Sequence, residues 1–185
     1  MVAVVPHLTV VGGCPGSGKT RYLRRMMEDG LIREHLEDYL EKLLDLEQNL
    51  NELKRSLQMG CRIGISGQSF REVYRRRLLE KGLESVPGLK IEWVFFELNP
   101  KACLENIIKD GLVGKGLAKE RVLSVLEIAE NSAYNIPRKA KVLLVVGREV
   151  TQQDLAKFFR RYDFGPARKD VETKIHRYLR PDSAS

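Results

Sequence analysis

Four short apolar runs are spaced along the chain, and segments with helical periodicity separate them. The runs are HLTVVGG (7–13), CRIGIS (61–66), IEWVFFEL (91–98) and KVLLVVG (141–147). Each run is nearly continuous in apolar residues, which is typical of parallel strands buried on both faces. The pattern predicts an α/β fold in which a parallel sheet of four or five strands is flanked by helices.

Turn and capping residues mark the ends of the predicted helices. Ser69 and Glu72 have the spacing of a capping box at the start of a helix that Gly82 would end. Pro100 stands at a first-turn position of a second helix. Thr151 is the predicted N-cap of a third helix.

Residues 31–59 depart from the alternation of strands and helices. A second strand is weak or absent there, and apolar residues recur at a spacing of three and four. The stripe consists of Leu36, Tyr39, Leu43, Leu46, Leu50, Leu53 and Leu57. This narrow pattern predicts a long helix that replaces or follows the second strand and forms a coiled-coil seam. The seam of this helix (33–59) either joins a second copy in a homo-oligomer or packs on its own core, which we favour.

The composition is that of one globular domain over residues 1–185. The chain has 185 residues, of which 43% are hydrophobic and 31% charged, enough for one well-buried core. Three cysteines without a framework spacing indicate reduced thiols and a cytoplasmic protein. Pro6 and His7 break the apolar start of the chain, so we expect no signal peptide, and no stretch is apolar enough for a membrane span. We expect residues 181–185 to be a frayed tail.

Positive charge is concentrated toward the C-terminus. The net charge is +7, and the part from Arg138 onward has 12 Lys and Arg against 6 Asp and Glu. This excess indicates either a polyanionic partner or a basic face in solvent. The stretch FFRRYDFGPARKD (158–170) interleaves aromatic and basic residues, as a base-stacking surface does. The helical spacing of Phe158, Phe159 and Tyr162 nevertheless favours a place in the core.

The first apolar run leads into a glycine-rich turn that matches the pattern G-x-x-x-x-G-K-[ST] between a strand and a helix. It consists of Gly13, Cys14, Pro15, Gly16, Ser17, Gly18, Lys19 and Thr20. Glycines let main-chain N–H groups surround a phosphate, and the helix that follows adds the positive end of its dipole. Lys19 is placed to reach the β- and γ-phosphates, and the Thr20 hydroxyl to ligate Mg²⁺. The motif predicts a nucleoside triphosphate site.

Together with two later blocks, this motif resembles the small P-loop kinases, most closely the 5′-hydroxyl polynucleotide kinase type. The blocks are LTVVGGCPGSGKT, CRIGISGQSFREVYRRRLLEKG and KIEWVFFELNPKACLENIIKDG, and the resemblance extends over about residues 7–135. It implies a five-stranded parallel sheet with the phosphate loop after its first strand, an acidic base after the second and a basic lid after the fourth. It also implies transfer of the γ-phosphoryl group of ATP, with Mg²⁺, to a hydroxyl.

The resemblance assigns the catalytic base to HLEDYL (35–40), which is similar to the D-D-Y stretch of the family. Glu37 or Asp38 is then the carboxylate that orients the acceptor hydroxyl. On the predicted heptad helix the same two residues would instead face solvent. Gly67 stands where such kinases often have an aspartate near the phosphates, so a carboxylate is missing there.

The resemblance also assigns cations to the lid and to the acceptor. Segment 112–118 is glycine-rich, and Lys115 at its tip would close over the phosphates in place of the family's arginines, or belong to a plain surface loop. Arg71 and Arg75 share one face of their predicted helix and would bind substrate phosphate. The next residue, Arg76, points away from that face, toward solvent.

Two function hypotheses of different classes remain. The first is an ATP- and Mg²⁺-dependent phosphotransferase that acts on a hydroxyl of a nucleic-acid end, a nucleotide or a related small molecule. The second is a nucleotide-binding or NTP-hydrolysing switch or assembly module without kinase activity. The general layout favours the first, whereas Gly67 and the lid without arginines favour the second.

Overall fold

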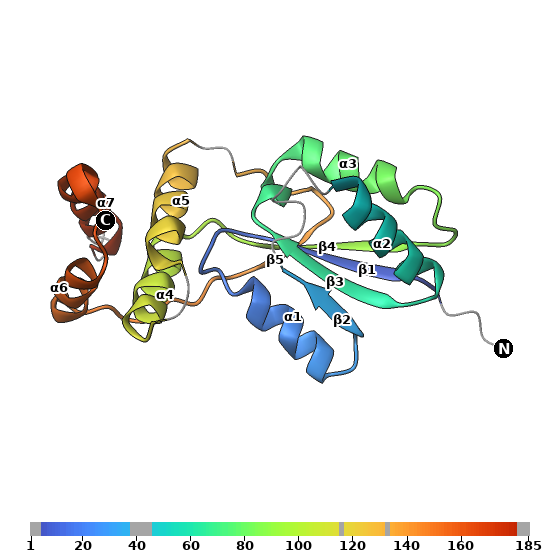
Figure 1. Cartoon of the computed structure of the whole chain (residues 1–185), viewed down its shortest axis with the longest axis horizontal. Coiled ribbons are helices and arrows are strands. Elements are labelled where there is room, and N and C mark those ends of the chain that lie inside the picture. The colour runs from blue at the N-terminus through green and yellow to red at the C-terminus, as the bar shows by residue number, and fades with distance from the viewer. Residues whose placement is uncertain (1–4, 38–45, 115–116, 132–133, 181–185) are drawn as a thin grey trace. The chain divides into compact units, whose positions relative to one another are not determined.

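The computed structural model describes residues 5–37, 46–114, 117–131 and 134–180 of the chain (Figure 1). The chain forms two compact units, each built from segments that are far apart in the sequence. The sheet unit contains Met1–Gly13, Gly18–Glu97 and Tyr134–Leu143, and the helical unit contains Cys14–Ser17, Leu98–Ala133 and Leu144–Ser185.

Five parallel strands form the sheet of the first unit, within the described residues. They are β1 (His7–Gly12), β2 (Glu34–Leu36), β3 (Arg62–Gly67), β4 (Lys90–Phe96) and β5 (Lys141–Leu143), in the order β2-β3-β1-β4-β5. Every neighbouring pair is parallel, as the continuous apolar runs predicted. The order changes direction at β1, and ligands of open parallel sheets bind beyond the carboxyl ends of the strands at such a point. The carboxyl end of β1 is therefore the expected ligand site.

The fifth strand is shorter than the apolar run 141–147 predicted. At this edge Glu97 N donates a hydrogen bond to Leu143 O, at 2.8 Å. Farther along, the carbonyl of Val146 accepts a hydrogen bond from the side chain of Asn106, at 2.9 Å. This carbonyl is therefore paired with a side chain rather than with a neighbouring strand.

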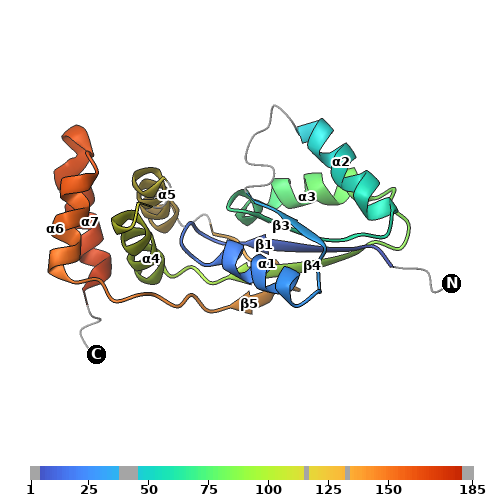
Figure 2. The same cartoon turned by 60° about the horizontal axis from the view of Figure 1, so that its bottom comes forward.

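Helices cover both faces of the sheet (Figure 2). The helix α1 (Lys19–Glu28) lies on one face, and α2 (Leu46–Gln58) and α3 (Val73–Leu83) lie on the other. Burial of apolar side chains between the sheet and the last two helices is the main force that holds the unit together. This core consists of Leu8, Val10, Leu53, Leu57, Ile63, Ile65, Phe70, Leu79, Leu83, Val86 and Phe95.

The long helix predicted over 31–59 is wrong in its first part. Residues Glu34–Leu36 form the strand β2, and α2 begins at Leu46. The strand has three residues, and of these His35 alone is half-buried while its two neighbours are exposed. A strand this short and exposed has no clear hydrophobic alternation. Leu36 was therefore assigned to the helical stripe although it lies in β2.

The described part of the leucine stripe packs within the chain. Leu53 and Leu57 are 2% and 0% exposed and belong to the core of the sheet unit. Leu50 packs against the same cluster. Tyr39 and Leu43 lie outside the described residues. The part of the stripe on α2 therefore follows the alternative that we favoured, packing on the chain's own core.

The capping box predicted at Ser69 is wrong. Ser69 begins a 3₁₀ turn, η2 (Ser69–Arg71), and α3 starts only after Glu72, which makes no side-chain cap. Gly82 lies inside α3, and a Cβ there would come within 2.9 Å of Leu50 Cδ1. The glycine lets α2 and α3 pack closely rather than ending the helix.

Four α-helices form the described part of the helical unit. They are α4 (Pro100–Leu112), α5 (Ala118–Glu130), α6 (Gln152–Arg161) and α7 (Arg168–Leu179), with the 3₁₀ turn η3 (Gly165–Ala167) before α7. Pro100 occupies the first turn of α4 and Thr151 caps α6, as predicted. Asp154 completes a capping box with Thr151, which was not predicted from the sequence. None of the helices in the described ranges combines the length and apolar character that crossing a bilayer requires.

An aromatic cluster joins α6 to the segment before α7. Phe158, Phe159 and Phe164 are 0%, 5% and 5% exposed, and the ring centroids of Phe158 and Tyr162 are 4.8 Å apart. These rings fill the core of the helical unit, which confirms the core interpretation of FFRRYDFGPARKD. At this exposure the three phenylalanines present little ring surface to solvent, which favours the core over base stacking.

An ion pair ties α4 to α6 and makes part of the stability depend on pH. Lys109 Nζ lies 2.7 Å from Asp154 Oδ2, which also accepts hydrogen bonds from Thr151. The hydrogen bond from Lys109, followed by those from Thr151, lowers the pKa of Asp154 to about 2. The pKa of an aspartate in an unfolded chain is about 4. The stabilisation is therefore complete above pH ~4 and is lost as the pH falls toward the folded-state value.

We predict that Asp154→Asn lowers the free energy of unfolding at neutral pH by about 1 kcal/mol, a typical value for a helix cap. Thermal unfolding of both proteins at a series of pH values from neutral to acid measures the difference. It should shrink below pH ~4, because the wild-type carboxylate then takes up a proton on unfolding. A difference that stays constant down to the lowest pH would contradict the lowered pKa of Asp154.

Candidate phosphate-binding site

The chain between β1 and α1 folds into a tight loop at the carboxyl end of the central strand. Ser17 N donates a hydrogen bond to Cys14 O (3.2 Å) across a four-residue turn. Pro15 and Gly16 are its central residues, and Gly16 has φ 76°, as the second central position of a type II turn requires. Gly18, the N-cap of α1, has φ 104°. Both glycines are needed because other residues rarely adopt these angles.

Space as well as conformation restricts Gly16. A Cβ on this residue would lie 2.5 Å from the carbonyl oxygen of Cys103 and 2.9 Å from Ile107 Cγ1, and both of these residues belong to α4. The tip of the loop therefore packs directly on α4. Cys14 and Ser17 are 0% and 4% exposed, so the loop presents mainly main-chain groups.

The start of α1 gives the loop its positive character. The helix begins at Lys19, directly after the loop, and the first N–H groups of a helix have no partner within it. These groups and the helix dipole favour an anion at this end. Lys19 Nζ donates a hydrogen bond to Gly13 O (2.8 Å), so the ammonium group lies against the first residue of the loop. Chemically, the arrangement suits a chain of phosphates.

Thr20, the predicted metal ligand, lies in the first turn of α1. Among the described residues, no group of three or more His, Cys, Asp or Glu side chains could hold a metal ion. Mg²⁺ commonly binds through few protein ligands together with phosphate oxygens, so Thr20 fits an ion that arrives with a nucleotide. Gly67 pairs with Gly12, the last residue of β1 before the loop. Because glycine has no side chain, this position next to the loop has no carboxylate.

The predicted base and lid are only partly within the described residues. Asp38 and Lys115 lie outside them. Glu37 follows β2, is exposed, and has its Oε1 3.2 Å from His35 Nε2. Because β3 alone separates β2 from β1, the end of β2 is about 10 Å from β1, two strand spacings. Glu37 stays a predicted acceptor-orienting residue.

Arg71 and Arg75 come together after the carboxyl end of β3. Glu72 contacts both, with Oε1 3.8 Å from Arg71 Nη2 and Oε2 3.8 Å from Arg75 Nε. The arginine side chains are 19% and 9% exposed. Arg71 Nε is buried and has no hydrogen-bond partner in the described structure. A buried guanidinium N–H without a protein acceptor, as at Arg71 Nε, favours an anionic ligand at this place.

Arg76 was predicted to face solvent, but in the structure it is a buried residue with a structural role. It is 7% exposed and donates hydrogen bonds to Phe70 O (2.6 Å), Asn135 O (3.0 Å) and Asn135 Oδ1 (2.6 Å). Burial lowers its pKa from the ordinary value. Through these bonds Arg76 holds η2, and with it Arg71, to the segment that begins at Tyr134. No local pattern signals the role, since Asn135 is 59 residues away in the sequence.

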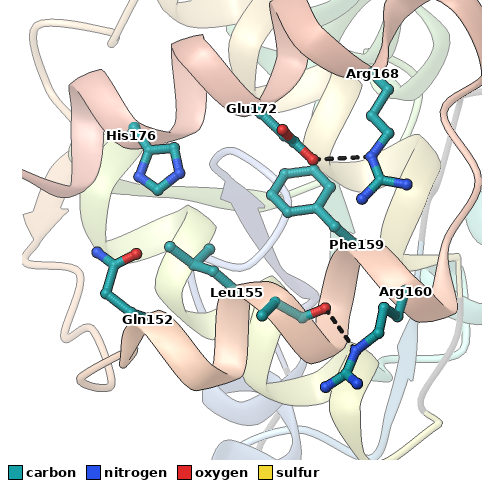
Figure 3. A pocket seen from close by; sticks show the side chains of 8 residues that line it. Gln152, Leu155, Phe159, Arg160, Arg168, Glu172 and His176 are labelled. Carbon is teal, nitrogen blue, oxygen red and sulfur yellow. Dashed lines mark hydrogen bonds and ion pairs between the residues drawn. The ribbon is translucent and has the colours of Figure 1, made fainter.

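A groove of about 350 Å³ between α6 and α7 contains none of the predicted site residues (Figure 3). The side chains that line it and carry labels are Gln152, Leu155, Phe159, Arg160, Arg168, Glu172 and His176. Arg168 Nε lies 2.9 Å from Glu172 Oε1, and Arg160 Nε donates to Ala156 O (3.3 Å). Both arginines are thus engaged on their own helices, and the loop after β1 remains the candidate site.

Comparison with known proteins identifies the fold. No protein-family model matches the chain, and no curated protein matches it significantly. Among solved structures, a gluconokinase from Sinorhizobium meliloti 1021 matches 84% of this chain and 93% of its own, with a TM-score of 0.50 and 18% identity. A shikimate kinase from Bacteroides thetaiotaomicron matches 83% of this chain and 94% of its own, with a TM-score of 0.45 and 9% identity. An uncharacterised protein from Eubacterium ventriosum ATCC 27560 matches 93% of this chain and 99% of its own, with a TM-score of 0.48 and 12% identity.

The similarity to gluconokinase shows that the chain has the fold of the P-loop kinases. The sheet has its five parallel strands, and the phosphate loop follows the first of them, as the resemblance implied. The finer likeness to the 5′-hydroxyl polynucleotide kinase type stays a prediction.

We predict that Gly16→Ala destabilises the protein more than Gly30→Ala. The two glycines have similar φ values, 76° and 69°, but a Cβ at Gly30 has nothing within 4 Å. Gly30→Ala should cost about 1 kcal/mol for the left-handed backbone. Gly16→Ala should cost a further ~1–3 kcal/mol because its methyl group overlaps Cys103 O. Urea unfolding of both variants measures this, and equal losses would contradict the close packing of the loop on α4.

Proposed function

We propose that the protein is an ATP-dependent phosphotransferase that moves the γ-phosphoryl group of Mg·ATP to a hydroxyl of a small anionic acceptor. The single observation that carries the proposal is the phosphate loop at the carboxyl end of the central strand β1, with α1 starting directly after it. The kinase-type fold supports it. Phosphoryl transfer needs positioning and charge stabilisation above all, and both are properties of such a loop.

Each predicted residue has a role in this proposal. Main-chain N–H groups of the loop bind the β- and γ-phosphates, apart from Pro15, which has no N–H, and Ser17, whose N–H donates to Cys14 O. Lys19 offsets charge on the transferred group, and Thr20 ligates Mg²⁺. Glu37 or Asp38 orients the acceptor hydroxyl. Lys115 closes over the phosphates from the lid.

Arg71 and Arg75 support an anionic acceptor. Both side chains are mostly shielded from water, and the buried Nε of Arg71 has no hydrogen-bond partner in the described structure. A carboxylate or phosphate on the acceptor would complete the cluster with charge-assisted hydrogen bonds. Sugar acids, such as the gluconate for which the similar Sinorhizobium enzyme is named, and nucleotides have this character. The buried phenylalanines of the helical unit give no support to stacking of a nucleic-acid end.

A nucleotide-dependent switch without kinase activity is the second candidate. Gly67 favours it, because the position next to the loop has no carboxylate for the metal or the acceptor. The switch would bind Mg·ATP, and hydrolyse it or not, without labelling any acceptor.

Incubation with γ-labelled ATP and a panel of acceptors tests the proposal. The panel contains gluconate, nucleosides, nucleotides and 5′-hydroxyl oligonucleotides. We expect label on an anionic small molecule, and a loss of about 100-fold or more in kcat for Lys19→Ala, since it removes transition-state charge stabilisation. Label on oligonucleotides alone would shift the acceptor to a nucleic-acid end. Label on nothing, with Mg·ATP still bound, would favour the switch.

We predict that Arg71→Gln raises the KM for the acceptor about 10- to 100-fold, the usual effect of losing one hydrogen bond to a charged group. The KM for ATP should change little, because Arg71 follows β3 rather than the phosphate loop. Arg77→Gln is the matched control, since Arg77 lies nearby on α3 and is exposed. Steady-state kinetics with both substrates varied separate these effects. Equal changes in the two KM values would contradict an acceptor role for Arg71.

A further inference from the structure

One side chain of α4 connects the tip of the phosphate loop to the segment that follows β5. Asn106 Nδ2 donates hydrogen bonds to Gly16 O (2.9 Å) and to Val146 O (2.9 Å). All three residues belong to the helical unit. A single amide group thus uses both of its N–H donors on two main-chain carbonyls that are 130 residues apart, from position 16 to position 146.

Arg148 fixes the orientation of that amide. Its Nε donates to Asn106 Oδ1 (3.1 Å), and its Nη2 donates to Asn106 O and to Asp110 Oδ1 (2.8 Å). A guanidinium group can only donate, so the amide oxygen faces Arg148 and the NH₂ group faces the two carbonyls. With the amide reversed, its oxygen would face both carbonyl oxygens and its NH₂ group would face a donor.

The segment of Arg148 is itself pressed against α4. A Cβ on Gly147 would lie 3.0 Å from Ala102 Cα and would overlap the carboxylate of Glu105. Burial is the largest cause of the raised pKa of Glu105, in keeping with this close cover. The main chain at Gly147 thus lies close against α4, and the Arg148 side chain, 48% exposed, reaches Asn106 from the surface.

The bond to Gly16 controls the direction of a main-chain N–H group. The peptide unit is planar and trans, so the carbonyl of Gly16 and the N–H of Ser17 point in opposite directions from the same plane. Asn106 holds the carbonyl toward α4. The N–H of Ser17 is thereby held toward the inside of the turn, where it lies 3.2 Å from Cys14 O.

We infer that Asn106 is a positioning residue that shapes the phosphate loop for nucleotide before the nucleotide binds, and that Arg148 keeps its amide in the donating orientation. This inference rests on the nucleotide binding proposed above. Without Asn106 the loop would have to be ordered at the expense of binding free energy, so affinity for nucleotide falls. Acceptor binding, which uses Arg71 and Arg75, is unaffected.

Asn106→Asp keeps the shape of the side chain, removes both N–H donors and adds a negative charge. Asn106→Ala removes the same donors without adding a charge, so a raised Kd for both variants attributes the loss to the hydrogen bonds. Asn131→Asp is the matched control, with the same chemical change at an exposed position at the end of α5. Calorimetric titration with Mg·ATP should give a Kd about 10- to 100-fold higher for Asn106→Asp, from the loss of two hydrogen bonds, and an unchanged Kd for Asn131→Asp. Thermal unfolding without nucleotide shows that the three variants are folded.

Arg148→Gln and the double variant Asn106→Ala/Arg148→Gln test whether Arg148 acts through Asn106. Arg148→Gln should raise the Kd for Mg·ATP, and adding it to Asn106→Ala should raise the Kd no further, because the two residues form one unit. Additive effects would overturn the role given to Arg148.

The outcomes separate this inference from the proposed function. A wild-type protein that binds no Mg·ATP overturns the proposed function and this role with it. Wild-type binding together with equal Kd values for Asn106→Asp and Asn131→Asp overturns the role of Asn106 alone. If the Asn106 variants do not fold, Arg148→Gln decides, and an unchanged Kd for that variant overturns the inference.

Discussion

The phosphate loop depends on one steric constraint, the left-handed backbone of Gly16 against the carbonyl of Cys103. With φ 76° and no room for a Cβ, this residue lets the chain turn back within four residues and rest on α4. Residues 13–18 alone connect the end of β1 to the start of α1, so the first N–H groups of α1 follow the loop directly. An anion site made of main-chain groups needs few side chains, and side chains then serve to fix its shape and add charge.

The order of the strands brings further charges to the carboxyl edge of the sheet. β1 is the central strand and β3 its neighbour, so Gly12 and Gly67 end side by side. The chain after β3 then places Arg71 and Arg75 at the same edge of the sheet, held by the buried Arg76. The edge is rich in cations and has no carboxylate at Gly67. That balance favours anionic ligands at this edge of the sheet.

Local patterns predict what depends on neighbours in the sequence. The apolar runs predicted four of the strands, and the glycine motif predicted the loop, because each signal lies within a few residues. The segment 31–59 was interpreted as a helix throughout because β2 is too short and exposed to show alternation. Asn106 and Arg76 could not be found in this way, since their partners Gly16 and Asn135 are 90 and 59 residues away in the sequence. Such pairs become visible only when the fold brings them together.

Nuclear magnetic resonance of the loop amides during a titration with Mg·ATP tests the central claim most directly. If main-chain N–H groups hold the phosphates, the amide resonances from Gly16 to Thr20 shift strongly and their hydrogen exchange slows, while the amides of α6 and α7 stay unchanged. Saturable binding of Mg·ATP with unshifted loop amides, or with shifts centred on the groove between α6 and α7, would contradict the account.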